Sequence, residues 1–311
     1  MTGVEPRKRS APQGRMADEL GAGARGADAD RAGAPGAPWR DGQTPWQLRM
    51  YRKSLKKRQK VGMIAEMLGP LRDEWCLLLT AGDNNGAINH ELRALGGRWA
   101  WAELEADGVP AMEAFLGETV HAARADALPF PDALFERVVV IDVHEHLSDP
   151  RTLNAEIARA LAPGGLAIVT TPSGDERLPV ARLKRWVGMS PRAYGHVVQG
   201  FTTGELGEMM RASGLHVVGR GAYSRFFTEL AELAINFAYV KVLARRKRHP
   251  AVREGTIAPS SETQLRAVEK TYRAYAAVYP LVRAFSALDA LVPGEGGYAV
   301  AVAARKPGGE R

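Results

Sequence analysis

The chain has 311 residues, of which 45% are hydrophobic and 25% are charged. This composition excludes wholesale disorder, and the length is enough to bury at least one large hydrophobic core. A single cysteine excludes a disulfide framework and a cysteine-based zinc finger, and is typical of a reducing compartment. Lysine and arginine number 42 against 35 aspartates and glutamates, which gives a net charge of +7.

The excess positive charge lies in one short segment. Seven cations and no acid occur between Leu48 and Lys60, which leaves 35 cations and 35 acids in the rest of the chain. The segment has three interpretations: the solvated face of a helix that covers a pocket, contact with an anionic membrane surface, or binding of nucleic acid. No recognised nucleic-acid-binding motif accompanies the cations, so we predict no nucleic-acid partner. The seven are Arg49, Arg52, Lys53, Lys56, Lys57, Arg58 and Lys60.

Residues 1–44 are rich in Gly, Ala, Pro and Arg and show neither helical nor strand periodicity. They cannot bury enough apolar surface to offset their ordering entropy, which predicts a disordered tail. No apolar run follows the first charges, which argues against a secretory signal peptide. No stretch reaches the roughly 18 apolar residues of a membrane-spanning helix. We therefore expect a cytoplasmic protein, with peripheral contact to an anionic membrane left open by the basic segment.

Strand and helix patterns alternate along the rest of the chain. Helices are expected where apolar residues recur at helical spacing, and strands where short apolar runs end at polar residues. The expected strands cover 74–79, 98–103, 120–125, 135–142, 166–171, 215–219 and 298–304. The expected helices cover 46–67, 87–95, 111–116, 153–161, 202–213, 226–246 and 262–291.

This alternation, with central strands that are hydrophobic on both faces, predicts a doubly wound α/β fold with a seven-stranded, mainly parallel sheet. Ligands of such sheets bind beyond the carboxyl ends of the strands. We expect the chain to be organised in five parts: the tail 1–44, a basic N-terminal helix 45–70, the α/β core 71–225, a helical insertion 226–293, and the last strand with its tail 294–311.

The loop after the first expected strand carries glycines at Gly82 and Gly86, which allow close approach of a ligand to the backbone. A dinucleotide site has the pattern G-x-G-x-x-G, but Asn84 and Ala87 occupy the second and third glycine positions. A pyrophosphate-binding loop is therefore disfavoured, and with it a nicotinamide-dependent reductase. A plain strand-to-helix turn remains an alternative for this loop.

Acids end the second and third expected strands. Glu103 follows the glycines by about twenty residues, where a carboxylate commonly binds the two hydroxyls of a ribose. Asp126 is placed to accept a hydrogen bond from an exocyclic adenine amine. The alternatives are an exposed carboxylate at Glu103 and a turn residue at Asp126.

Four blocks in order resemble the class I S-adenosylmethionine-dependent methyltransferases, specifically their small-molecule "type 11" branch. The blocks are DALPFPD at 126–132, FERVVVIDVHEHLSDP at 135–150, EIARALAPGG at 156–165, and YGHVVQGFTTGEL at 194–206 with ASGL ending at Leu215. The resemblance covers residues 74–220, with the last strand completing the set. It implies a Rossmann-like methyltransferase fold and S-adenosyl-L-methionine as the cofactor.

The resemblance also implies roles for individual residues. Gly82 and Gly86 would shape the pocket for the methionine end, Glu103 would hold the ribose, Asp126 and Ala127 would flank the adenine, and Asp142 would end the strand beneath the sulfonium. The family's first loop usually reads D-x-G-x-G-x-G, whereas here Thr80 replaces the acid. Asp83 or Asn84 would then contact the methionine ammonium.

Methyl transfer needs a general base only when the acceptor is a hydroxyl or an amine that still carries its proton. We single out His146 and His196 as candidate catalytic residues. His146 has an alternative role in bracing the following helix, and His196 in organising the loop over the site. Asp142, Glu145 and His146 form an acidic cluster that a hard cation would suit, but such carboxylates are commonly solvated or cap helices, so we predict no metal.

The insertion has two interpretations: an aromatic-lined helical pair packed on the core, or a lid that forms a hydrophobic acceptor pocket or touches lipid. We predict an S-adenosylmethionine-dependent methyltransferase that favours O-methylation of a small or lipid-linked acceptor. A catalytically silent cofactor-binding or scaffold protein is the alternative, because the first glycine loop departs from the family pattern.

Overall fold

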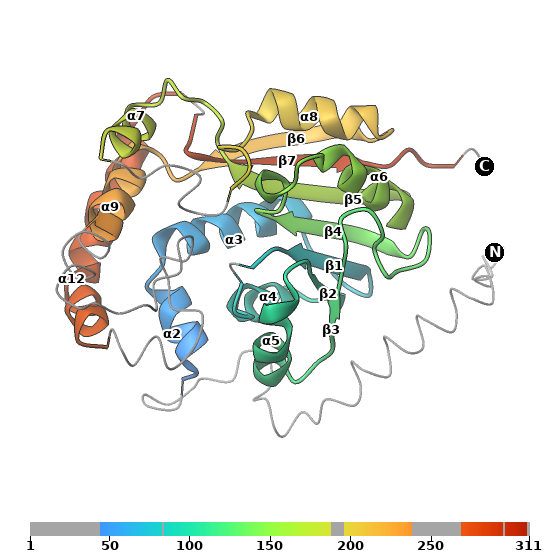
Figure 1. Ribbon diagram of the computed structural model, residues 1–311, viewed down its shortest axis with the longest axis horizontal. Coiled ribbons are helices and arrows are strands. Elements are labelled where there is room, and N and C mark those ends of the chain that lie inside the picture. The colour runs from blue at the N-terminus through green and yellow to red at the C-terminus, as the bar shows by residue number, and fades with distance from the viewer. Residues whose placement is uncertain (1–43, 83, 188–195, 238–268, 295, 310–311) are drawn as a thin grey trace, which may run out of the picture.

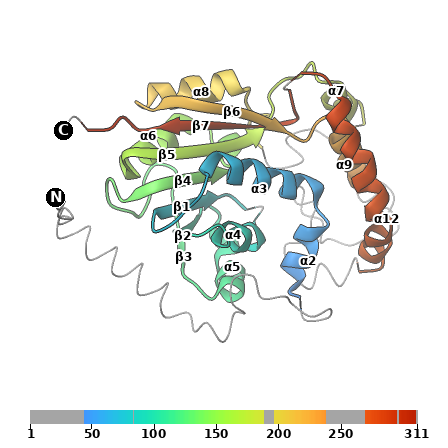
Figure 2. The ribbon, with the colours of Figure 1, turned by 180° about the vertical axis from the view of Figure 1, so that it is seen from behind.

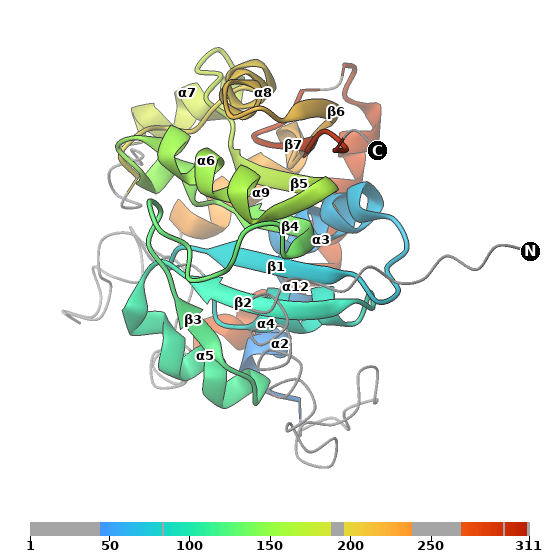
Figure 3. The same ribbon diagram turned by 90° about the vertical axis from the view of Figure 1, so that its right-hand side faces the viewer.

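The structure is a computed structural model that describes residues 44–82, 84–187, 196–237, 269–294 and 296–309. The expectations for the N-terminal tail and for residues 238–268 lie outside these ranges. The described residues form a seven-stranded sheet with the strand order β3-β2-β1-β4-β5-β7-β6 and with helices packed on it (Figure 1). The predicted fold class is confirmed. Figure 3 shows this order from β6 at one edge of the sheet to β3 at the other.

The sheet is parallel except for its last strand in the chain. β7 pairs antiparallel with both β5 and β6, whereas β1, β2, β3, β4 and β5 pair in parallel. All six residues of β1 are buried, as expected for a central strand covered by helices on both faces. The strands are β1 Trp75–Thr80, β2 Arg98–Glu103, β3 Val120–Ala122, β4 Phe135–Ile141, β5 Leu161–Pro172, β6 His216–Tyr223 and β7 Ala299–Arg305.

Two hydrophobic clusters cover the two faces of the sheet. One includes side chains of α6 and α8, and the other includes side chains of α2, α3, α4 and α5. The α-helices are α2 Trp46–Arg52, α3 Leu55–Leu68, α4 Ala87–Arg93, α5 Val109–Leu116, α6 Pro150–Ala160, α7 Pro179–Trp186, α8 Thr203–Ala212, α9 Phe226–Phe237 and α12 Glu269–Ala287. Three short 3-10 helices are η1 Ala106–Gly108, η2 His144–His146 and η5 Leu288–Leu291.

Several boundaries differ from the sequence expectations. The expected basic helix is two helices, because Ser54 leaves the helical conformation and its hydroxyl caps α3 by accepting from the Lys57 amide at 3.4 Å. β3 stops at Ala122, three residues before the expected end. β5 begins at Leu161, and β6 runs to Tyr223, so both are longer than expected. The helix α7 was not predicted.

The helices α7, α9 and α12 lie together at one end of the molecule, next to α2 and α3 (Figures 1 and 2). The hydroxyl groups of Tyr272 and Tyr275 on α12 donate to the carbonyl oxygens of Arg49 and Lys53, at 2.9 and 2.5 Å. The basic N-terminal helices are therefore held between the sheet and the insertion. Within the described ranges, no helix has the length and apolar content that crossing a membrane requires.

Candidate functional site

The candidate site lies at the carboxyl ends of β1, β2, β4 and β5, where parallel α/β sheets bind their ligands. The first part of the site along the chain is the glycine loop after β1. Gly82 and Gly86 have φ angles of 77° and 87°, in the left-handed region that glycine adopts without cost. A Cβ on Gly86 would lie 2.6 Å from the Phe115 ring, and one on Gly82 would collide with the Glu105 carboxylate. The left-handed φ angles favour glycine at both positions, and their role in shaping the pocket for the methionine end stays a prediction.

Asn84 is buried and shapes this loop from within. Its Nδ2 donates to Oδ1 of Asn89 at 2.6 Å, and its own Oδ1 accepts from the Gly86 amide at 3.1 Å. These bonds give Asn84 a structural role, and contact with the cofactor's ammonium remains a prediction. Asp83, the alternative ammonium contact, lies outside the described residues.

Glu103 ends β2 directly across from Thr80 and is fully buried. Its Oε2 accepts from the Thr80 hydroxyl at 2.6 Å, and its Oε1 accepts from the amides of Gly82 and Glu105 at 2.8 and 3.0 Å. Burial raises the pKa of this carboxyl and outweighs the lowering by the three hydrogen bonds. A carboxylate has about four acceptor positions, so one remains for a ribose hydroxyl. The exposed Glu105 side chain, which lies over Gly82, would have to move to admit it.

Asp126 and Ala127 are exposed and lie beyond the end of β3. The Asp126 carboxylate is bound by the Arg124 guanidinium through two hydrogen bonds of 2.9 and 2.7 Å. That hydrogen-bonded pair lowers the pKa of Asp126. The role of these two residues beside the adenine stays a prediction.

Asp142 follows β4 with a φ of 50°, a left-handed conformation that aspartate tolerates better than most residues. Its Oδ1 accepts from the Thr170 hydroxyl at 3.0 Å, and its Oδ2 forms an ion pair with Lys60. Burial raises the pKa of Asp142, but the Lys60 charge and its hydrogen bond, with Lys56 and Thr170, outweigh burial and leave the pKa below its ordinary value.

Lys60 is a site residue that the sequence analysis missed. It is only 6% exposed, although it belongs to the segment whose cations we had placed mainly on the outer faces of the helix. A signal was present in the sequence: Lys56, Lys60 and the fully buried Ile64 are spaced four residues apart and so share one face of α3.

η2 brings His144 and Glu145 into the interior. The His144 ring is fully buried, with Nε2 2.9 Å from Oδ1 of Asn154, and burial lowers its pKa to about 4. Glu145 is also fully buried, and its Oε2 accepts from the Thr171 hydroxyl at 3.1 Å. Oε1 of Glu145 has no hydrogen-bond partner among the described residues. Burial, and then the charge of Asp142, raise the pKa of Glu145 well above its ordinary value.

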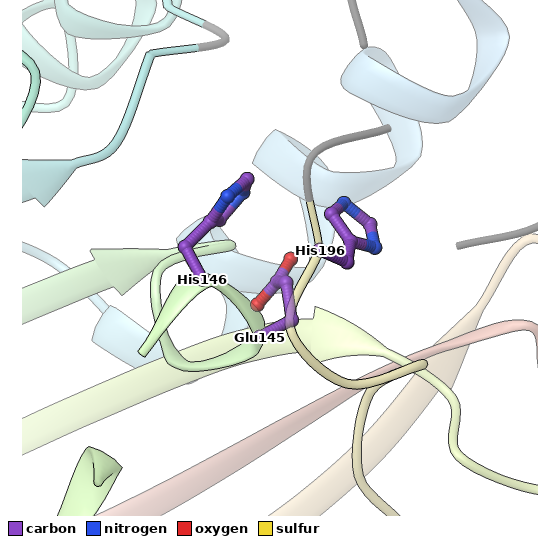
Figure 4. A group of neighbouring side chains, drawn as sticks. All are labelled: Glu145, His146 and His196. Carbon is purple, nitrogen blue, oxygen red and sulfur yellow. The ribbon is translucent and has the colours of Figure 1, made fainter. Parts of the chain in front are cut away.

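His146 and His196 come together from different parts of the chain (Figure 4). The centroids of their rings are 4.9 Å apart, the rings meet edge to face, and both residues are half-buried. The segment that carries His196 is fixed where the Val197 amide donates to the Glu145 carbonyl at 2.8 Å. Burial, reinforced by the charge of His146, lowers the pKa of His196 to about 4. The structure thus brings together the two histidines that we had singled out from the sequence.

The two histidines and the neighbouring Glu145 also supply possible ligands for a metal ion. One ligand atom from each of Glu145, His146 and His196 lies within 4.8 Å of the others. Two imidazoles and a carboxylate suit zinc or non-haem iron. This group differs from the acidic cluster seen in the sequence. It contains His196 and not Asp142, whose charge is neutralised by Lys60.

A second buried ionic cluster lies between the sheet and the helical end of the molecule. Glu229 of α9 is 2% exposed and forms ion pairs with Lys56 of α3, at 3.2 Å, and with Lys184 of α7. The Ser224 hydroxyl donates to the same carboxylate at 2.5 Å. Burial raises the pKa of Glu229, but the two lysines and Ser224 outweigh it and lower the pKa to about 2. This cluster joins three helices that lie next to the site.

Comparisons with known proteins agree with the fold. The match to the [4+2]-cyclase SpnF covers 99% of this chain and 100% of the SpnF chain, with a TM-score of 0.50 and 21% identity. Phosphoethanolamine N-methyltransferase 2 of Haemonchus contortus, solved with S-adenosyl-L-methionine, matches 80% of this chain and 52% of its own with a TM-score of 0.47 and 16% identity. A SAM-dependent methyltransferase of Methanosarcina mazei matches 79% of this chain and 97% of its own, with a TM-score of 0.46 and 13% identity. The likeness to SpnF, at 21% identity, shows the fold alone.

The sequence itself carries the family assignment. No curated protein sequence matches the chain. Residues 79–169, which run from β1 through β5 and include η2, match the family model described as "Methyltransferase domain", of the type 11 branch. The resemblance seen in the sequence is thereby confirmed. The chain contains a methyltransferase domain of this family, and the activity that the domain implies is methyl transfer from S-adenosylmethionine.

Proposed function

We propose that this chain methylates a hydroxyl oxygen of a small or lipid-linked acceptor, and that the pair of histidines at the carboxyl end of β4 removes the hydroxyl proton. The observation that carries the proposal is the edge-to-face contact of His146 and His196, 4.9 Å apart, beside the ion pair of Asp142. The cofactor would bind along the glycine loop and Glu103, and it supplies the methyl group on its sulfonium.

The state of His196 supports a role as a base. With its pKa near 4, the ring is neutral at physiological pH, which is the protonation state that a general base needs. Methyl transfer from a sulfonium is an in-line displacement, and correct alignment of the acceptor supplies much of the rate. The backbone hydrogen bond from Val197 to Glu145 holds the segment of His196 in place.

The proposed function is tested by supplying S-adenosylmethionine with a labelled methyl group to the purified enzyme and to acceptors that differ only in a phenolic hydroxyl, an amine or an activated carbon. Labelling of the hydroxyl acceptor is expected. The natural acceptor would be sought by mass spectrometry of a deletion strain, as a compound that lacks an increment of about 14 daltons. Transfer confined to amines or carbon, or no binding of S-adenosylmethionine at millimolar concentration in calorimetry, contradicts the proposal.

Glu103 gives a sharp test of the cofactor site. We expect Glu103→Ala to weaken S-adenosylmethionine binding by about 10- to 100-fold, because hydrogen bonds to a charged group contribute about 1.5–3 kcal/mol each. Isothermal calorimetry measures the change, and Glu208→Ala is the control because that side chain is exposed on α8. Undiminished binding by Glu103→Ala, in a variant that still unfolds cooperatively, would rule out the ribose assignment.

Removal of metal ions distinguishes a general-base role of His146 and His196 from a metal-binding role. A histidine nitrogen bound to a metal cannot accept a proton, so the proposal expects the activity to survive dialysis against EDTA. Methyl transfer before and after dialysis is the measurement, with the metal content determined by mass spectrometry. A loss of activity that zinc or iron restores would assign Glu145, His146 and His196 to a metal site instead.

A further inference from the structure

The outward face of α12 is apolar. Val278, Leu281, Phe285 and Leu288 are all exposed and follow one another at spacings of three or four residues, so they form one stripe along the helix. Leu281 is 73% exposed, and Leu291, in η5 directly after, is 77% exposed. Ala274, Ala277, Ala284 and Ala287 of the same helix are also exposed. We call Val278, Leu281, Phe285, Leu288 and Leu291 the apolar stripe.

The inward face of the same helix is the more polar one. Tyr272 and Tyr275 donate to backbone carbonyls of the segment before α3, and the hydroxyl of the buried Tyr279 accepts from Nη1 of Arg58 at 3.1 Å. The buried Ser286 hydroxyl is hydrogen-bonded to that of Thr228 at 2.5 Å. A surface helix normally has the reverse arrangement, with its apolar residues on the core side. All members of the apolar stripe stay exposed, although the Phe285 ring also packs edge to face on Phe227 of α9.

The exposed charge beside the apolar stripe is positive. Arg283 is exposed, and the one acid among the side chains described along 272–291, Asp289, is buried and accepts from the amides of Phe227 and Thr228. A second copy of the chain docked on this face would bring the two Arg283 side chains together without an exposed acid of this stretch to pair them. An anionic lipid surface, by contrast, offers phosphates to Arg283 and acyl chains to the stripe.

We propose that the apolar stripe docks the protein on the surface of an anionic lipid bilayer, with α12 lying in the plane of the interface. The exposed Trp186 lies on α7, which packs on α9 as α12 does, and it is an aromatic side chain of the kind that favours that interface. This role goes beyond methyl transfer, since docking needs neither cofactor nor acceptor. Of the two segments for which the sequence left lipid contact open, it favours the insertion over the basic segment.

Docking is tested by sedimentation of the full chain with vesicles of phosphatidylglycerol and phosphatidylcholine, without cofactor. The wild-type protein is expected to pellet with these vesicles, less so as salt is raised. The double variant Leu281→Gln/Leu288→Gln is expected to lower the partition coefficient by about tenfold or more, because two apolar side chains lose their burial. Arg283→Gln is expected to lower it by about fivefold on phosphatidylglycerol vesicles and not on pure phosphatidylcholine.

The control variant is Val218→Gln, since Val218 is another exposed large hydrophobic residue but lies on β6. It is expected to leave pelleting unchanged. Three results would each overturn the proposal: no pelleting of the wild-type chain at low salt, equal pelleting of the double variant, or a concentration-dependent dimer that the double variant abolishes. The last would assign the stripe to a second copy of the chain. Because no methyl transfer is measured, the outcome is independent of the proposed function.

Discussion

His196→Ala is expected to lower kcat for a hydroxyl acceptor by about 10²- to 10⁴-fold, the usual contribution of a positioned general base. The KM for S-adenosylmethionine should change little, because the His196 ring contacts His146 of η2, whereas the proposed ribose contact, Glu103, ends β2. Steady-state kinetics of methyl transfer measure both constants. His216→Ala is the matched control, since His216 is exposed at the start of β6.

The acidity of the acceptor distinguishes a base from a residue that only holds the loop. If His196 removes the proton, the loss caused by His196→Ala should shrink for phenols acidic enough to be ionised already. A loss of equal size for every phenol would mean that His196 positions the acceptor and does not take its proton. The wild-type kcat should fall only as the pH drops towards about 4, where His196 becomes protonated, and not near the ordinary pKa of histidine.

The fold could be predicted from the sequence because its strongest signals are local. The buried run from Val138 to Ile141 and the glycines that end neighbouring helices each specify an element within a few residues. The predicted strand ends were wrong where the end of a strand depends on the strand that pairs with it. β6 runs on to Tyr223 because β7, more than seventy residues later, pairs with it up to that residue.

The sequence motifs pointed to residues that the structure brings together, but they gave no sign of charges that pair over long distances in the chain. His146 and His196 came from two blocks of the resemblance, and the structure places them in contact. Lys60 was read as one of a run of surface cations because its partner, Asp142, is 82 residues away. Only the packing of α3 across the ends of the strands brings the two together. The ion pair of Lys56 depends in the same way on Glu229, which is 173 residues away.

Replacing Glu229 is expected to have the largest effect on stability. Glu229→Ala leaves Lys56 and Lys184 without the carboxylate that neutralises them between three helices. Breaking a buried ion pair by removing one partner costs about 3–5 kcal/mol, so the free energy of unfolding should fall by that amount. Urea denaturation measures it, with Glu208→Ala as the control because Glu208 is exposed on α8. A loss below about 1 kcal/mol, the range of surface pairs, would contradict the buried cluster.

The pH dependence of this loss identifies its cause. The pKa of Glu229 is lowered to about 2 in the folded protein, against an ordinary value of 4.5. A lowered pKa stabilises the folded state above the unfolded pKa, and this stabilisation disappears as the pH falls through the folded pKa. The stability difference between wild type and Glu229→Ala should therefore be full near pH 7 and shrink between about pH 4.5 and 2. A difference that stays constant over this range would indicate lost packing instead. The triple variant Lys56→Met/Lys184→Met/Glu229→Leu should recover most of the stability, because apolar replacement of a whole buried ionic cluster is often neutral.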